Sequence, residues 1–405
     1  MKNLSLFIII GMVLVISCSD FPTNFHRVDS DAVRLLDFIY EPAEASPGDT
    51  IMVKAVFSGK KINLADISWS FSSNVVLDKY GSDTAFNIVP LAAVPQEDYF
   101  SEKTSCFSFK FVVPQDLFKT SGQIPENWIE ILPPEIIKSL PPSLTGFNKG
   151  QLIDMVNLLT QSPQMYSTIA ANLQLPVNEI SRILPHFSQL FTVQMRFIAD
   201  IKNQLHIKSN YSVRYHSRFS KIPQISVYVN HNPRIDSIGI YKVKGEKNSY
   251  NPAEKKHLFI RIDSNIAPAN TVPVEDGYSY FLVAFYNQPD TFQSLFDLSD
   301  SSGSKAHLEK ITTIWFFKQN DDETRDISPN EFMKTQNGIG SVTKSYNINS
   351  PISYYDLQSL VKIIPPTDKS IRSINVWCQV QDNTDNEILH PVGSSLMEGS
   401  FTFQY

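Results

Sequence analysis

Ile67-Ser68-Trp69-Ser70-Phe71 and Phe107-Ser108-Phe109-Lys110-Phe111 are the stretches that decide the fold of this chain. In both, apolar residues alternate with small or polar ones at every position. Successive side chains of an extended strand point to opposite faces, so each stretch places its apolar side chains on one face. This alternation predicts half-buried β-strands.

The same alternation recurs along the chain, in segments separated by turns rich in proline, with 25 Pro among 405 residues. In the second half Trp315 occupies the place that Trp69 has in the first, which indicates two units of similar layout. The further predicted strands are Val33 to Tyr40, Ile51 to Phe57, Ile225 to Val229, Ile235 to Val243, Gly277 to Tyr286, Ile311 to Phe317, Ile371 to Val380 and Phe401 to Tyr405.

Many short strands, proline-rich turns and a tryptophan on an early central strand resemble the immunoglobulin-like β-sandwiches of bacterial surface proteins, present twice in tandem. The resemblance implies a mainly β protein with one sandwich in residues 31–231 and a second in residues 232–405. The inter-sheet cysteine pair of antibody domains is absent. Another fold of two packed sheets is the alternative.

Residues 116–205 depart from this alternation and predict an α-helical insertion in the first sandwich. Apolar residues there recur at helical spacing and would share faces of about four helices. They are Leu152, Met155, Val156 and Leu159, then Ile180, Ile183 and Leu184, and finally Phe191, Met195, Ile198 and Ile201 in a longer helix from Phe187 to Asn203.

The N-terminus has the three parts of a secretory signal: Lys2, an apolar stretch, and a small residue before a cleavage point. The apolar stretch is shorter than the roughly 20 residues that span a bilayer. Val15-Ile16-Ser17-Cys18 resembles the lipobox of bacterial lipoproteins. The resemblance implies removal of residues 1–17 and lipidation of Cys18, followed by a tether over residues 18–30. An ordinary cleaved signal with an incidental cysteine is the alternative.

We therefore expect a lipid-anchored protein of the cell envelope, attached to the outer membrane through Cys18. The leaflet and the side of the membrane stay open. The formal net charge of −6 offers no field that would attract nucleic acid, so no nucleic-acid partner is expected. Residues 166–184 resemble a DNA-binding helix-turn-helix, but the second helix carries only Arg182 as a cation.

Motifs for catalysis and cofactors are missing from the sequence. Gly338-Ile339-Gly340 lacks the third glycine of a dinucleotide site, and the eight histidines show no local pair of the kind that zinc sites use. We expect no cofactor and a protein that is not an enzyme. An enzyme whose active site is assembled from distant loops is the alternative.

Alternation in the segment Ile374 to Val380 places Asn375, Trp377 and Gln379 on one face. A tryptophan among amides on an open sheet face is suited to stacking on a sugar ring and bonding its hydroxyls. These residues are the candidate ligand site, and a glycan-binding surface lipoprotein is the function that they would support. The alternative is that Trp377 packs under a loop or against the neighbouring domain.

A second candidate site is the acidic loop that contains Asp382, Asp385 and Glu387. Calcium takes six to eight oxygen ligands, and such a loop supplies several. A solvated hairpin is the alternative. Cys106 and Cys378 belong to different predicted domains, so we expect them not to be joined.

The expected function is that of a non-catalytic binding or scaffold protein, with a protein or glycan partner of unknown identity. Loop insertions on rigid β scaffolds are where function concentrates, so the helical insertion is the expected partner site. The competing account is that the apolar faces of its helices cover an open sheet or separate the two sandwiches.

Overall fold

The computed structural model describes the strands of both sandwiches and part of the insertion. The described residues are 28, 32–77, 83–92, 96–97, 104–132, 134–140, 142–161, 167–168, 171, 191–202, 204–215, 218, 229–247, 250–251, 257–262, 270–287, 294–296, 306–308, 311–319, 333–334, 341–344, 358–365, 369, 373–382 and 392–405. The predicted strand at Ile225, the predicted helix at Ile180 and the helix-turn-helix resemblance lie outside this part of the chain, apart from isolated positions.

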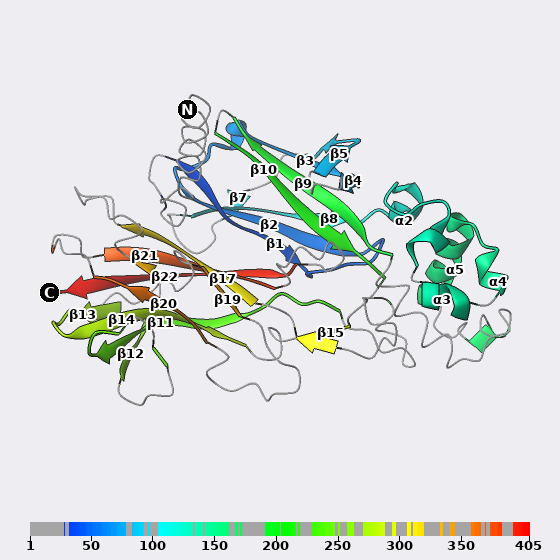
Figure 1. Cartoon of the computed structure of the whole chain (residues 1–405). Coiled ribbons are helices and arrows are strands. Elements are labelled where there is room, and N and C mark those ends of the chain that lie inside the picture. The colour runs from blue at the N-terminus through cyan, green and yellow to red at the C-terminus, as the bar shows by residue number, and fades with distance from the viewer. Residues whose placement is uncertain are drawn as a thin grey trace, which may run out of the picture.

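The first sandwich has two four-stranded antiparallel sheets (Figure 1). One has the order β1-β2-β8-β7, formed by Val33–Glu41, Thr50–Gly59, Thr104–Val112 and Gln96–Glu97. The other has the order β10-β9-β3-β6, formed by Leu205–Val213, Val193–Ile201, Ile67–Ser72 and Val89–Pro90. The short 3-10 helix η1 (Leu64–Asp66) precedes β3, and a hairpin of β4 (Asn74–Leu77) and β5 (Asp83–Phe86) follows it.

The second sandwich has two five-stranded sheets. One has the order β12-β11-β14-β20-β18, formed by His257–Ile262, Ile235–Lys244, Tyr278–Tyr286, Gln358–Ile363 and Met333–Lys334. The other has the order β13-β22-β21-β17-β19, formed by Thr271–Pro273, Ser394–Gln404, Ser373–Asp382, Ile311–Gln319 and Ser341–Lys344. β15 (Ser294–Phe296) and β16 (Ala306–Leu308) pair as a separate hairpin.

Both sandwiches start in a similar way, with a first strand in one sheet and a short later segment that pairs in parallel with the last strand of the other sheet. β1 pairs antiparallel with β2, and after the cis Glu41–Pro42 bond Ala45 pairs in parallel with Val213 at the end of β10. In the second sandwich β11 pairs with β14, and after β12, which also pairs with β11, β13 pairs in parallel with β22. This order of strands is that of an immunoglobulin-like sandwich. The prediction of a mainly β protein with two tandem sandwiches of this kind is confirmed.

Each sandwich has its own hydrophobic core between its sheets. Trp69, on β3, is buried in the first core, and Trp315, on β17, is buried in the second. The repeated position of the two tryptophans therefore reflects equivalent central strands. Two separate clusters of buried side chains are what two packing units require.

The two sandwiches also contact each other face to face. The outer side of sheet β1-β2-β8 packs on the outer side of sheet β22-β21-β17, and a cluster of buried side chains fills the space between them. We call this cluster the seam: Val28, Leu36, Ile39, Val56, Cys106, Phe316, Trp377 and Leu396. Four sheets are thus stacked in layers, as Figure 1 shows.

The helical insertion follows β8 and extends from one end of the first sandwich (Figure 1). Its described elements are α2 (Leu117–Thr120), η2 (Trp128–Ile131), α3 (Pro134–Ser139), α4 (Pro142–Thr145) and α5 (Lys149–Gln161). The N-terminus of α5 has a reciprocal cap: the Gln151 amide donates to Asn148 Oδ1 at 2.9 Å, and the Asn148 amide donates to Gln151 Oε1 at 3.0 Å. Leu152, Val156 and Leu159 are buried on one face of α5, as predicted.

The predicted helix from Phe187 to Asn203 is wrong, because Val193–Ile201 forms β9 in the middle of a sheet. This strand is buried on both faces at nearly every position, so its sequence lacks the alternation of a half-buried strand. Met195, Ile198 and Ile201 also have helical spacing by coincidence. The insertion therefore ends before β9, and β9 and β10 complete the first sandwich.

Candidate functional site

Several predicted site residues lie outside the part of the chain that the structure describes. Cys18, Asp385 and Glu387 are among them, so lipidation and the full acidic loop stay predictions. Asn375, Trp377, Gln379 and Asp382 are described, and all four are buried.

The orientation predicted for the strand Ile374 to Val380 agrees with the structure, but the face that carries Trp377 is not open. Cys378 points into the core of the second sandwich, and Trp377 points into the seam, where its exposed fraction is 0%. Asn375 and Gln379 on the same face are also buried, each at 6%. These residues do not form an exposed platform for a sugar, because the first sandwich covers them. The alternative, packing against the neighbouring domain, describes Trp377.

A buried carboxylate in the seam links the two sandwiches. Asp37 accepts hydrogen bonds from Gln379 Nε2 at 2.6 Å and from Ser394 Oγ at 2.6 Å, and its Oδ1 also accepts from the Phe38 amide at 2.8 Å. Desolvation by burial raises the pKa of Asp37 to about 6, although these three donors act in the opposite direction. Because two of the donors belong to β21 and β22, the bonds of Asp37 fix the register of one sandwich on the other.

A local irregularity of β1 directs Asp37 toward the seam. Pairing of β1 with β2 shifts between Leu35 and Asp37, which is the signature of a β-bulge. Because of this bulge, two consecutive residues face the second sandwich: Leu36 packs in the seam, and Asp37 accepts a hydrogen bond from Gln379. One signal of this site is present in the sequence, because Asp37 is the one acid in the apolar run Leu35 to Tyr40.

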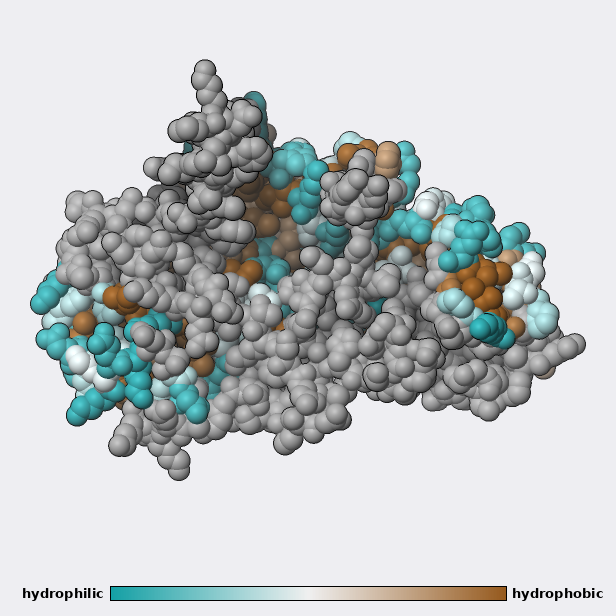
Figure 2. All heavy atoms as spheres, viewed as in Figure 1, coloured by the Kyte–Doolittle hydropathy of each residue, from teal (hydrophilic) through white to brown (hydrophobic). Residues whose placement is uncertain are grey.

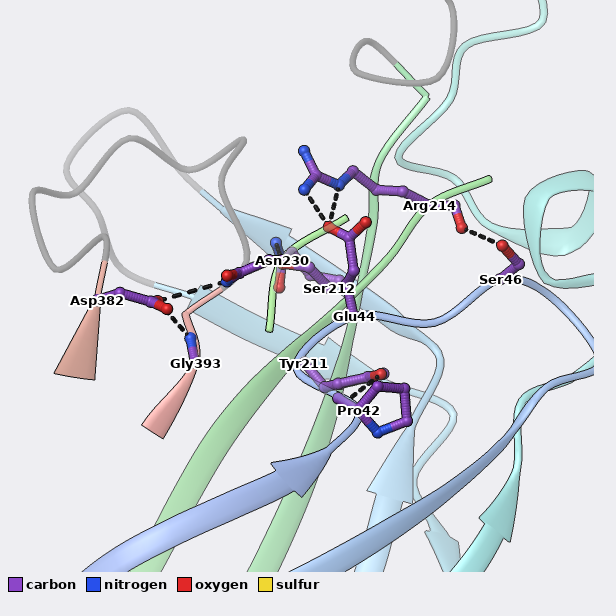
Figure 3. Close-up of polar contacts among 10 residues, drawn as sticks. Pro42, Glu44, Ser46, Tyr211, Ser212, Arg214, Asn230, Asp382 and Gly393 are labelled. Atoms are coloured by element: carbon purple, nitrogen blue, oxygen red, sulfur yellow. Dashed lines mark hydrogen bonds and ion pairs between the residues drawn. The ribbon is translucent and has the colours of Figure 1, made fainter. Parts of the chain in front are cut away.

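The segment that connects the two sandwiches, which contains Asn230 and Asn232, also forms hydrogen bonds close to Ser394. Asn232 Nδ2 donates to the Tyr40 carbonyl at 2.7 Å, and the Ser394 amide donates to Asn232 Oδ1 at 2.9 Å. Asp382 Oδ1 accepts from the Gly393 amide at 2.5 Å and from Asn230 Nδ2 at 3.4 Å (Figure 3). Asp382, which was predicted for a calcium loop, is 1% exposed and bonds to the chain itself.

The tether also reaches the seam. Val28 is 2% exposed, and its amide donates to the Phe317 carbonyl at 2.8 Å. In the described part of the chain, β19 pairs with residues Ile311 to Ile314 of β17, and Val28 bonds farther along the same strand. Val28, which belongs to the predicted tether of residues 18–30, therefore packs against the second sandwich.

A buried ion pair fixes the loop after β1. Arg214 Nε donates to Glu44 Oε2 at 3.0 Å, and Arg214 Nη2 contacts the same oxygen (Figure 3). Ser46 Oγ donates to the Arg214 carbonyl at 2.7 Å, and Tyr211 Oη donates to the Pro42 carbonyl at 3.1 Å. These contacts stabilise the segment after β1, where the chain passes from the sheet of β1 to the sheet of β10.

The helical insertion is bonded to the sandwich that carries it. Gln123 Nε2 donates to the Gln194 carbonyl at 2.9 Å, and the Gln194 amide donates to Gln123 Oε1 at 2.8 Å, so the side-chain amide pairs with β9 as a strand would. Phe118 of α2 stacks on Tyr215, with ring centroids 4.7 Å apart. Trp128, Leu152 and Phe118 belong to the same core cluster as the sandwich. This packing supports the account in which the insertion covers one end of the first sandwich.

The described residues contain no group of three or more His, Cys, Asp or Glu side chains arranged to hold a metal ion. Among the same residues no helix has the length and apolarity needed to cross a membrane. Cys106 and Cys378 are both buried and are not joined in a disulfide, as predicted. Burial raises the pKa of the Cys378 thiol well above its ordinary value.

Comparisons with known proteins give no family for this chain. No family model matches it, and no curated protein matches its sequence. Among solved structures, one that contains manganese lipoxygenase of Gaeumannomyces graminis and part of zonadhesin of Komagataella pastoris is 10% identical, with a TM-score of 0.15, over 91% of this chain and 96% of that one. Collagen adhesin from S. aureus is 8% identical, with a TM-score of 0.14, over 94% and 96%. Similarity at this level carries no argument about function.

Proposed function

We propose that the protein is a lipid-anchored, extracytoplasmic binding or scaffold protein of the cell envelope. In this proposal the stacked sandwiches form a rigid spacer, and the surface of the helical insertion contacts the partner. The observation that carries the proposal is the seam, which joins the two sandwiches along their faces. Domains joined only by a linker would move relative to each other, whereas a large apolar interface holds them in one orientation.

The spacer separates the two functional ends. β1 starts at Val33, soon after the tether, and ends at Glu41, where β8 also ends and the insertion begins. We call these ends the anchor pole and the insertion pole. A strand of this length spans about 26 Å, so the insertion is held away from the point where the tether enters.

The surface of the insertion is partly apolar. Figure 2 shows hydrophobic residues gathered on the helices at one end of the molecule. Leu158 of α5 is 45% exposed, although its neighbours Val156 and Leu159 are buried. An exposed leucine between the buried positions of a helix is suited to a protein contact, although a single one is also normal on a surface.

The anchor is tested with Cys18→Ala in the full chain. Cells that express this variant should contain the protein in the soluble fraction, whereas the unchanged protein should float with membranes and should incorporate radiolabelled palmitate. A variant that still floats with membranes and carries label would refute lipidation at Cys18.

The partner surface is tested with a photo-crosslinking amino acid at position 158, with position 258 as the matched control. Leu258 on β12 is 53% exposed and belongs to the second sandwich. We expect a discrete crosslinked product from position 158 in intact cells and none from position 258. The absence of a product at 158, with normal membrane attachment, would restrict the insertion to a structural role.

The exposed tryptophan face on which the glycan-binding alternative depended is not present, because Trp377 is buried in the seam. The catalytic alternative stays a prediction from the sequence. Neither is proposed as a second function.

A further inference from the structure

The chain enters the folded body beside an exposed loop at the anchor pole. Val33 at the start of β1 pairs with Gly59 at the end of β2, and the Lys60 amide donates to the Ala32 carbonyl at 3.2 Å. Ala32 is four residues after Val28. The loop from Lys60 to Asp66 therefore starts next to the segment that leads back to Cys18.

The outer side of this loop combines cations with an apolar tip. Lys60 and Lys61 are exposed, Ile62 is buried, and Leu64 is 54% exposed. The Ala65 amide donates to Asn63 Oδ1 at 3.2 Å, which caps η1 and holds the turn that carries Leu64.

A third lysine lies beside the loop on the neighbouring turn. The Lys202 amide donates to the Asp66 carbonyl at 2.8 Å, and the Lys202 side chain is exposed. Among the described residues, the acids nearby are Asp66 itself, partly buried, and Asp200, whose carboxylate contacts the His206 ring. In the described part of the chain, the three lysines therefore outnumber the two acids around Leu64.

The tether limits how far this pole can lie from the membrane. Ten residue steps separate Cys18 from Val28 in the sequence, and a fully extended chain covers about 35 Å over that length. Four stacked sheets with about 10 Å between neighbours make the body thicker than 30 Å, roughly as much as the tether can reach. Of the two poles, the one next to the tether is the one that lipidation brings to the bilayer.

We propose that the loop Lys60 to Asp66, together with Lys202, is a membrane-contact surface that lies among anionic lipid headgroups, with Leu64 inserted at the boundary with the acyl chains. The inference rests on the proposed lipidation of Cys18. It adds a second contact, which sets the orientation of the body and directs the insertion pole away from the bilayer. Basic side chains around an apolar tip are the combination that interfacial segments use.

The test uses the lipidated full chain, reconstituted in phosphatidylcholine vesicles with phosphatidylglycerol. Leu64→Cys is labelled with an environment-sensitive dye, and Leu158→Cys, a similarly exposed leucine at the insertion pole, is the matched control. Cys106 and Cys378 are buried, so the introduced thiol is the reactive one. Brominated lipids should quench the dye at position 64 at least about twofold more than the dye at position 158.

Flotation of the same vesicles separates the two proposals. Protein that does not float with vesicles, labelled at either position, contradicts the lipid anchor. Protein that floats but shows equal or no quenching at positions 64 and 158 keeps the anchor and overturns the membrane-contact surface.

Charge reversal tests the lysines. In a chain with Lys60→Glu, Lys61→Glu and Lys202→Glu, the dye at position 64 should lose at least about half of its quenching in vesicles with phosphatidylglycerol. The loss should be smaller in vesicles of phosphatidylcholine alone. Quenching that the three substitutions leave unchanged would overturn the role of the lysines.

Discussion

Replacing Trp377 with alanine should open the seam before it unfolds either sandwich. Trp377 is fully buried between the sheets β1-β2-β8 and β22-β21-β17, in contact with a cluster that also contains Cys106. Removal of a buried tryptophan side chain costs about 3–5 kcal/mol. If most of this loss falls on the seam, the population of the open state rises about 100-fold at the lower value, since 1.4 kcal/mol is a factor of ten.

The protein contains its own reporters for this experiment. Cys106 is buried in the seam, whereas Cys378 is buried in the core of the second sandwich. Brief exposure to a maleimide, followed by mass spectrometry of the peptides, measures the reactivity of each thiol separately. Trp377→Ala should increase the labelling rate of Cys106 by about 100-fold and that of Cys378 by much less.

Trp315→Ala is the matched control, because Trp315 is also fully buried but lies in the core of the second sandwich. It should increase the labelling of Cys378. Equal acceleration of both thiols in Trp377→Ala would refute the reasoning, because it would mean that the seam and the cores open as one unit. An unchanged rate at Cys106 would show that Trp377 does not hold the seam.

Two further predictions concern buried charges. The pKa of Asp37, raised to about 6 from 3.8, favours folding of the protonated form, so this contribution is complete below about pH 4 and is lost as the pH rises through 6. This loss in the free energy of unfolding amounts to about 3 kcal/mol. In urea unfolding measured at several pH values, Asp37→Asn should no longer show this loss between pH 4 and 6. Parallel pH profiles of the variant and the unchanged protein would contradict the prediction. Arg214→Met leaves Glu44 buried without its guanidinium partner and should cost about 3–5 kcal/mol in the same assay, whereas adding Glu44→Leu should recover part of the loss. A double variant that is no more stable than the single one would show that the charge of Glu44 is not the cause.

The sequence by itself determined the β class, the tandem arrangement and most of the half-buried strands. Trp69, in an alternating segment, and Trp315, at the corresponding place in the second half, indicated the central strands of two similar units. One-sided burial leaves a period of two around Trp69, whereas β17 is buried on both faces, with Trp315 in the core and Phe316 in the seam. The same rule gave the correct faces of the strand that carries Trp377 and Cys378. It also indicated correctly that Cys106 and Cys378 are not joined.

Only the tertiary structure decided which of those faces meet solvent. Trp377 and Gln379 point away from their own sandwich, and nothing in the local sequence says that another sheet lies over them. β9 shows the same limit. Gln194 and Arg196 are buried on its outer face by contacts with the insertion and with β10, so this strand carries no alternation to detect. Local periodicity records whether a side chain is buried, but the surface that buries it is contributed by segments far away in the chain. For that reason the seam and the end of the insertion could be identified only from the folded molecule.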